Sequence, residues 1–125
     1  MRANNAIGAY GERVAVQHLE NAGYTIVDRN WRCDIGEIDV VALAPSEASS
    51  RPCLVICEVK TRRGLGFGSG FEAVTPDKAA RLHRLGRRWL AENDQSRGTF
   101  MRFDVLAVHI PRHGEPRVEH LSGAF

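Results

Sequence analysis

Apolar side chains in the first half of the chain change from helical to strand-like spacing. In residues 8–22, small and apolar side chains recur every three or four positions, which predicts an amphipathic helix that Gly23 ends. Residues 24–31 are rich in β-branched and aromatic side chains and predict a strand. Residues 38–43 and 54–59 are short, nearly continuous apolar runs. Such runs are typical of central strands that are covered on both faces.

The second half of the chain predicts another helix and one or two further strands. Thr75 can cap a helix that extends to about Glu92, and residues 100–110 form a third apolar run. Residues 117–121 can add a short edge strand. The order of one helix, three strands, a second helix and one or two strands predicts an α/β fold around a mixed central sheet flanked by helices.

The composition narrows the class of protein. A chain of 125 residues, 43% hydrophobic and 26% charged, is expected to form one domain over residues 1–125. Residues 45–52 predict an exposed loop, residues 61–71 a glycine-rich loop, and residues 111–125 a C-terminal hairpin or tail. The chain has no apolar stretch close to the roughly 18 residues of a spanning helix and no signal-peptide core, so we expect a cytoplasmic protein without membrane segments. Three cysteines without paired metal-binding spacing are expected to be reduced thiols.

Charged residues inside the apolar runs are the first candidates for chemistry. Buried charges are costly unless they are paired or bind a metal, which singles out Asp39, Glu58 and Lys60. Because side chains alternate along a strand, Glu58 and Lys60 share a face, and Asp39 can converge with them if the two strands are neighbours. A divalent cation would relieve the repulsion between the two carboxylates, and Lys60 could act on a water or a phosphate. The alternative is a structural ion pair.

Glu12 and Glu37 are two further acidic candidates for the same site. Glu12 lies at the edge of the apolar stripe of the first helix, from where it could reach the same metal or form a helix-edge salt bridge. Glu37 could be an outer ligand, although capping of the turn after Gly36 is the interpretation we favour.

Basic residues are concentrated in two places, although the formal net charge is only +2. The second helix carries arginines on the arc opposite its apolar face, and more basic residues flank the glycine-rich loop. We expect phosphate contacts that position nucleic acid without reading its sequence, the alternative being a solvated helix face. The residues are Arg62, Arg63, Lys78, Arg81, Arg84, Arg87 and Arg88.

Several sequence motifs lie between about residues 8 and 108: G-x-x-G-E-x-x-A-x-x-x-L from Gly8, R-N-W-R, G-E-I-D-V-V, E-V-K-T-R, the helix with Lys78, and R-F-D-V. Taken together, these motifs resemble the YraN-like family of predicted bacterial endonucleases. The resemblance implies a restriction-endonuclease-like fold with an αβββαβ core, related to archaeal Holliday junction resolvases. It also implies an active site of the PD-(D/E)xK type, in which the proline of the motif is Ile38 here.

The resemblance assigns roles to four residues. Asp39 matches the metal-binding aspartate, Glu58 the second metal-binding carboxylate, Lys60 the catalytic lysine, and Glu12 the helix glutamate of the resolvase-like branch. With the backbone carbonyl of Val59, the three carboxylates are expected to hold Mg²⁺ or Mn²⁺.

The leading hypothesis is therefore an enzyme, a metal-dependent deoxyribonuclease that acts on branched or structured DNA, with single-stranded DNA left open as a substrate. A homodimer would suit a substrate that needs two cuts. Two alternatives remain open: a catalytically weak nucleic-acid binding module of the same fold, and a protein-interaction domain whose arginine helix docks an acidic partner.

Overall fold

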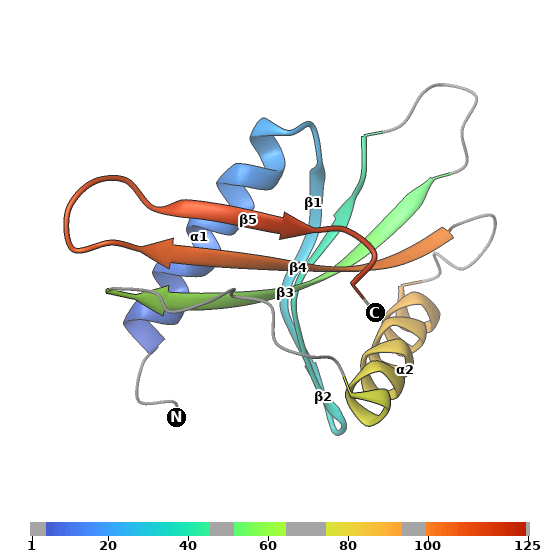
Figure 1. The fold of residues 1–125 in the computed structure, drawn as a ribbon. Helices are drawn as coiled ribbons and strands as arrows, with labels where there is room; N and C mark the ends of the chain where they lie inside the picture. The colour runs from blue at the N-terminus through green and yellow to red at the C-terminus, as the bar shows by residue number, and fades with distance from the viewer. Residues whose placement is uncertain (1–4, 46–51, 65–74, 94–99, 125) are drawn as a thin grey trace.

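The computed structural model describes residues 5–45, 52–64, 75–93 and 100–124. Two helices and five strands make up these ranges (Figure 1). In chain order they are α1 (Asn5–Asn21), β1 (Thr25–Cys33), β2 (Gly36–Leu43), β3 (Cys53–Arg63), α2 (Pro76–Glu92), β4 (Phe100–Ile110) and β5 (Arg117–Leu121). Most of the predicted loops at residues 45–52 and 61–71 lies outside the described residues.

The five strands form one mixed sheet in the order β1-β2-β3-β4-β5. All neighbouring strands are antiparallel except β3 and β4, which run parallel over their whole length. Parallel neighbours need a long crossover connection, and α2 lies in the one between β3 and β4. This architecture confirms the predicted mixed α/β fold and is consistent with a restriction-endonuclease-like core.

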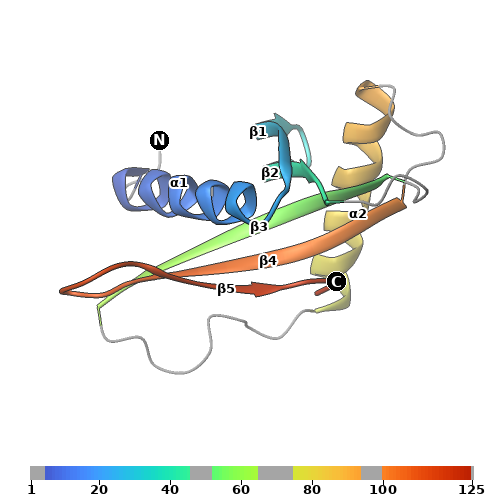
Figure 2. The same ribbon diagram turned by 90° about the horizontal axis from the view of Figure 1, so that it is seen from above.

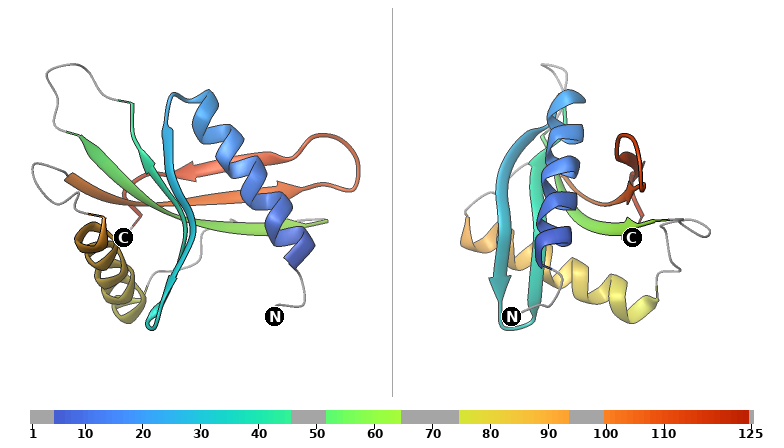
Figure 3. Two further views of the ribbon diagram at one scale, coloured as in Figure 1. Left: turned by 180° about the vertical axis from the view of Figure 1, so that it is seen from behind. Right: turned by 90° about the vertical axis from the view of Figure 1, so that its left-hand side faces the viewer.

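Each helix covers a different face of the sheet, so the core has two parts. Ala15 and Leu19 of α1 pack on one face with Val40 and Leu106, whereas α2 covers the other face through its own buried residues. Those residues are Leu82, Leu85, Gly86 and Trp89. Figures 2 and 3 show that the β1–β2 pair lies between the two helices and crosses the direction of β3, β4 and β5 steeply.

The ends of the elements follow local signals in the sequence. Thr75 caps α2 by accepting a hydrogen bond from the backbone N–H of Lys78 at 3.1 Å, and Pro76 begins the helix. Gly23, with φ of +93°, follows α1 in a backbone conformation that favours glycine. Neither helix in the described ranges combines the length and the apolarity needed to cross a bilayer.

The prediction of a loop directly after Lys60 is wrong, because β3 continues to Arg63. Its last residues pair in register with β4, with Arg63 opposite Ile110, and this pairing outweighs the polar composition. Helix α1 also packs tightly here, since a Cβ on Gly11 would overlap the side chain of Thr61. The longer β3 places Lys60 inside the sheet rather than at the start of a loop.

Candidate active site

The sheet opens between β2 and β3 at Asp39. The ladder between these strands ends at the pair Val40 and Cys57, and the next position in that register sets Asp39 opposite Glu58. There the Asp39 side chain takes the place of a backbone partner, because the N–H of Val59 donates a hydrogen bond to Asp39 Oδ2 at 2.8 Å. The β1–β2 pair turns away from β3 in this region (Figure 1). One carboxylate therefore both closes the end of the ladder and marks the point where the strands separate.

A cavity of about 400 Å³ lies at this opening, between the sheet and α2. Its walls bring together Asp39 and Glu58, as the strand pattern predicted, and Val59, whose backbone N–H bonds to Asp39. The other lining residues are Gly36, Glu37, Ile38, Ile56, Cys57, Arg81, Leu82 and Leu85. The cavity is thus lined by three acidic residues, one arginine and several apolar residues.

Burial and charge together perturb the Asp39 carboxyl. Burial raises the pKa of Asp39 to about 6 against the opposing hydrogen bond from Val59, and the negative charges of Glu37, Glu58 and Glu12 add to the increase. The protein thus keeps mutually repelling carboxylates close together in a partly dehydrated place. A divalent cation relieves such repulsion, which is why this arrangement is common where oxygen ligands hold a metal.

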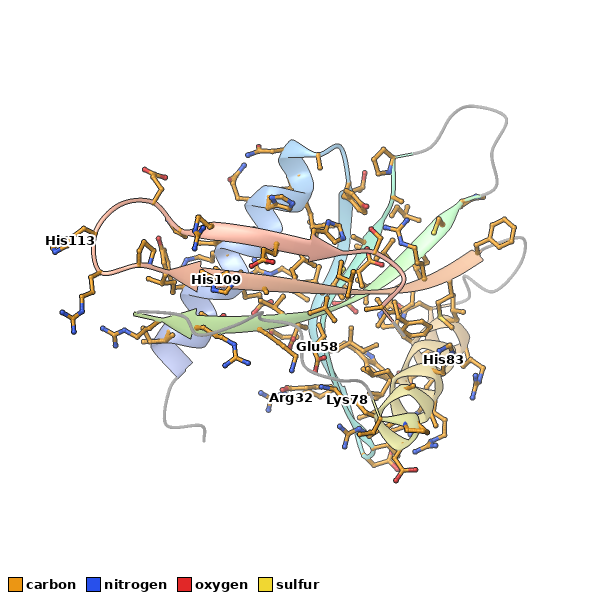
Figure 4. The ribbon with its side chains drawn as sticks, viewed as in Figure 1. Arg32, Glu58, Lys78, His83, His109 and His113 are labelled. Atoms are coloured by element: carbon orange, nitrogen blue, oxygen red, sulfur yellow. The ribbon has the colours of Figure 1, made fainter. Side chains whose placement is uncertain are left out.

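The carboxylate of Glu58 faces the start of α2. Figure 4 shows Glu58 on β3 and Lys78 on α2 pointing toward one another, and the Lys78 Nζ lies 3.3 Å from Glu58 Oε2. The same Oε2 atom is buried and has no hydrogen-bond partner. The ion pair therefore supplies charge to Glu58 without satisfying the geometry of a hydrogen bond.

Two of the expected catalytic residues lie beside the cavity rather than in its wall. Lys60 is half-buried on the same face of β3 as Glu58 and lies opposite Ala107 of β4. Glu12 is buried on α1, where Arg29 Nε lies 3.3 Å from its Oε1. Glu12 thus forms the salt bridge that was the alternative to metal ligation, and it acts on Asp39 through its charge.

The basic residues of α2 lie in different environments. Arg81 lines the cavity, Lys78 pairs with Glu58, and Arg84 and Arg87 are exposed. Arg88 is held by two intramolecular ion pairs, with Asp34 and with Glu92, the latter at 3.2 Å.

At the end of β3, Arg62 is half-buried and Arg63 is exposed. Glu37 pairs with Arg32 at 3.1 Å at the rim of the cavity. Exposed cations therefore flank the cavity on α2 and on the far end of β3.

Sequence reasoning gave no role to Asp104, the most completely buried charged residue described. Its side chain is 0% exposed on β4 and accepts hydrogen bonds from Arg102 Nη2 at 2.8 Å, from His120 at 2.7 Å and from the N–H of Gly123 at 3.0 Å. Burial alone would raise the pKa of Asp104, but the hydrogen bonds from His120 and Arg102 lower it to about 2. A charge inside the apolar run 100–110 is the signal that could have identified it.

Asp104 lies on the strand next to β3, outside the lining of the cavity. It lies opposite Cys57 in the β3–β4 register, next to Glu58, and its partners come from β4, β5 and the segment after β5. Arg102 also donates a hydrogen bond to the hydroxyl of Tyr24 at 2.8 Å. The network therefore fixes the strand next to β3 without contacting the cavity.

The donor set fits a hard cation held mainly by two carboxylates. Among the described residues, no group of three or more histidine, cysteine or acidic side chains is placed to hold an ion. Mg²⁺ commonly binds through one or two carboxylates and keeps several waters, so it does not need a complete set of protein ligands. Asp39, Glu58 and the Val59 carbonyl are therefore a suitable donor set for Mg²⁺. Cys33, Cys53 and Cys57 are free thiols, and burial raises the pKa of the Cys57 thiol.

Comparison with known proteins identifies close relatives over the whole chain. Residues 11–108 match the model of a family described as "Uncharacterised protein family UPF0102". A UPF0102 protein of Beutenbergia cavernae is 54% identical over 123 residues, covering 98% of each chain. One from Kineococcus radiotolerans is 51% identical over 123 residues, covering 98% of this chain and 96% of the relative, and one from Frankia casuarinae is 50% identical over the full length of both.

Proposed function

The chain belongs to the uncharacterised protein family UPF0102, and we propose that it is a metal-dependent endonuclease that hydrolyses phosphodiester bonds in DNA. One observation carries the proposal. Asp39 and Glu58, from two strands that separate at this point, meet in one cavity together with the Val59 backbone. Lys60 follows on the same face of β3, and the cations of α2 border the opening. Acidic groups that attract a cation, next to basic groups that attract phosphate, suit phosphodiester chemistry.

Mg²⁺ or Mn²⁺ would be held by Asp39, Glu58 and the carbonyl of Val59. When bound, the ion would stabilise negative charge that develops on the phosphate. The raised pKa of Asp39 supports this assignment, because burial and then the neighbouring carboxylates disfavour its negative charge, which a bound cation would stabilise. Glu12 remains bonded to Arg29 and contributes negative potential.

Lys60 is the proposed catalytic lysine. Its place two residues after Glu58 on one strand face gives its ammonium access to the same side of the sheet as the metal-binding carboxylate. A lysine ammonium there orients a water by hydrogen bonding and stabilises charge on a phosphate oxygen.

DNA would approach across α2 and the end of β3. Arg81 and Arg84 on α2, with Arg62 and Arg63 on β3, supply phosphate contacts on both sides of the cavity. Such contacts position a nucleic acid without reading bases, which suits a substrate defined by its shape, such as branched or structured DNA, with single-stranded DNA as a further candidate. Two cuts in one branched substrate would require two sites, which a homodimer supplies. An enzyme with this activity would act in the cytoplasm.

The test is a cleavage assay with matched variants. The wild type, Asp39→Asn, Glu58→Gln and Lys60→Ala would be incubated with four-way, flapped, single-stranded and duplex DNA in Mg²⁺, Mn²⁺ or chelator. We expect cation-dependent cleavage by the wild type and a loss of at least about 100-fold in each variant, since each change removes a group that acts on the transition state.

Glu20→Gln removes an exposed charge from α1 far from the site and serves as the control, with expected activity equal to wild type. If all three site variants retained the cleavage, the activity would come from a contaminant, and the proposal would be refuted.

A DNA-binding module without turnover is the second candidate. It is favoured by the ion pair between Lys78 and Glu58, which occupies one of the two carboxylates. This candidate predicts salt-dependent DNA binding that survives Lys60→Ala, together with no cleavage by the wild type on any substrate. Negligible DNA affinity at low salt would instead favour a protein-interaction domain.

A further inference from the structure

Lys78 forms an ion pair with one of the two carboxylates of the proposed metal site. Its Nζ is 3.3 Å from Glu58 Oε2, and the two side chains are 28% and 26% exposed, so solvent screens the pair only in part. Oε2 is nevertheless buried without a hydrogen-bond partner. A buried carboxylate oxygen that meets a charge but no donor in good geometry is incompletely satisfied, and a better cation can displace the one present.

The backbone of Lys78 is fixed, whereas its side chain can move. The residue lies in the first turn of α2, where its own N–H bonds to the Thr75 cap at 3.1 Å. Leu82 and Leu85, one and two turns later, anchor the helix in the apolar core beneath. The four-carbon stem of lysine is flexible, so the ammonium can leave Glu58 and reach outward without any movement of the helix.

We propose that Lys78 exchanges with the metal: its ammonium pairs with Glu58 while no divalent ion is bound, and ion binding displaces it so that it contacts a DNA phosphate. This inference rests on the proposed function, because it requires both a cation site at Glu58 and a nucleic acid nearby. Its physical basis is competition between a single positive charge at 3.3 Å and a double charge that binds carboxylate oxygens at about 2.0–2.1 Å.

The exchange couples two binding events. Lys78 lowers the affinity for the divalent ion, because the ion must replace it, and the bound ion raises the affinity for DNA, because it releases Lys78. Binding couplings of this kind are reciprocal, so DNA that captures Lys78 also strengthens ion binding. A salt bridge that stays in place would not link ion binding to DNA binding.

The first test measures Mn²⁺ affinity by the paramagnetic resonance signal of free Mn²⁺, without any cleavage. Lys78→Gln is expected to bind Mn²⁺ roughly three- to fivefold more tightly than the wild type, as the loss of a partly screened ion pair suggests. Lys78→Arg keeps the charge and is expected to stay within about twofold of the wild type. Arg84→Gln removes an exposed charge six residues further along α2, and at physiological salt its effect should also stay within about twofold.

The second test separates exchange from general electrostatics. DNA affinity would be measured in Ca²⁺, as an ion for binding without turnover, and in chelator. Lys78→Gln is expected to lower DNA affinity in Ca²⁺ but to have little effect in chelator, where Glu58 still holds the wild-type lysine. Arg84→Gln is expected to lower DNA affinity to the same extent in both conditions.

Three results would overturn the inference. Equal Mn²⁺ affinity of wild type and Lys78→Gln would show that Lys78 does not compete with the ion, and the proposed metal site would stand. An equal loss of DNA affinity in Ca²⁺ and chelator would make Lys78 an ordinary phosphate contact. Failure of every protein, wild type included, to bind Mn²⁺ would overturn the metal site itself and the inference with it.

A measurement on the wild type alone avoids dependence on variant folding. The ¹³Cε signal of Lys78 is expected to shift when Mg²⁺ is added, since its ammonium leaves Glu58. A Lys78 signal that does not move at saturating Mg²⁺ would also refute the exchange.

Discussion

Replacing Asp104 with asparagine tests whether the buried network next to β3 depends on a negative charge. The carboxylate accepts hydrogen bonds from Arg102, His120 and the Gly123 N–H at 2.7–3.0 Å while its side chain is 0% exposed. Asparagine preserves the shape but removes the charge, and its amide nitrogen would face one of these donors. The variant therefore leaves the Arg102 guanidinium with a weakened partner.

The magnitude follows from the shifted pKa. The pKa of Asp104 falls from 3.8 to about 2, and each unit corresponds to about 1.4 kcal/mol, so ionised Asp104 stabilises the fold by about 2 kcal/mol. With the misplaced amide donor, Asp104→Asn should lower the free energy of unfolding by roughly 2–4 kcal/mol at pH 7. Because the folded pKa is the lower one, this stabilisation is complete above the unfolded value and is lost as the pH falls toward 2. Roughly half of it should remain at pH 3.

The assay is urea unfolding at several pH values between 3 and 7, followed by tryptophan fluorescence, to which the buried Trp89 contributes. Glu119→Gln is the matched control, because Glu119 lies on β5, is 52% exposed and pairs with His109. Its effect should stay below about 1 kcal/mol. A difference between wild type and Asp104→Asn of less than about 0.5 kcal/mol at pH 7, or one that does not shrink between pH 5 and pH 3, would refute the reasoning.

Two further predictions concern the helix–sheet contact and the acidic site. Gly11→Ala should destabilise the protein by about 1–3 kcal/mol, because its Cβ would overlap Thr61. Gly8→Ala has open space around it and should stabilise α1 by up to about 1 kcal/mol. Thermal unfolding of both variants against the wild type tests this difference in sign. In chelator, Asp39→Asn should raise the free energy of unfolding by about 3 kcal/mol above pH 7, since the folded pKa of about 6 exceeds 3.8 and the ionised form is disfavoured in the fold. The hydrogen bond from Val59 is kept, because the side-chain oxygen of asparagine can still accept it. The gain in stability should vanish below about pH 4. A variant that is less stable than the wild type at pH 8 would contradict the prediction.

The regular elements were predictable because local signals agree with tertiary packing. The predicted strands at 100–110 and 117–121 match β4 and β5 in both bounds, and the Thr75 cap begins α2 as expected. The end of β3 was not predictable, since residues 61–63 are polar and are held in the strand by pairing with β4.

The site was predictable as far as strand alternation extends. Period-two spacing and the neighbouring strands place Asp39 and Glu58 together, which needs no knowledge of distances. The bond from Val59 to Asp39 and the pairing of Lys78 with Glu58 depend on where strands separate and how a helix docks. Spacing along the chain does not encode either of these. For the same reason the helical wheel, which grouped Arg88 with the other arginines of α2, could not show that Arg88 forms ion pairs with Asp34 and Glu92.

The hydrogen bond from Val59 to Asp39 makes one backbone amide a reporter on the site. Exchange of that amide hydrogen with solvent requires the carboxylate to release it, so its exchange rate follows every event that moves Asp39. Neighbouring amides inside the β2–β3 ladder, such as that of Cys57, provide an internal reference from the same strand. A single resonance in the unmodified protein can therefore follow the acidic pocket over time, with neither a substrate nor an attached label.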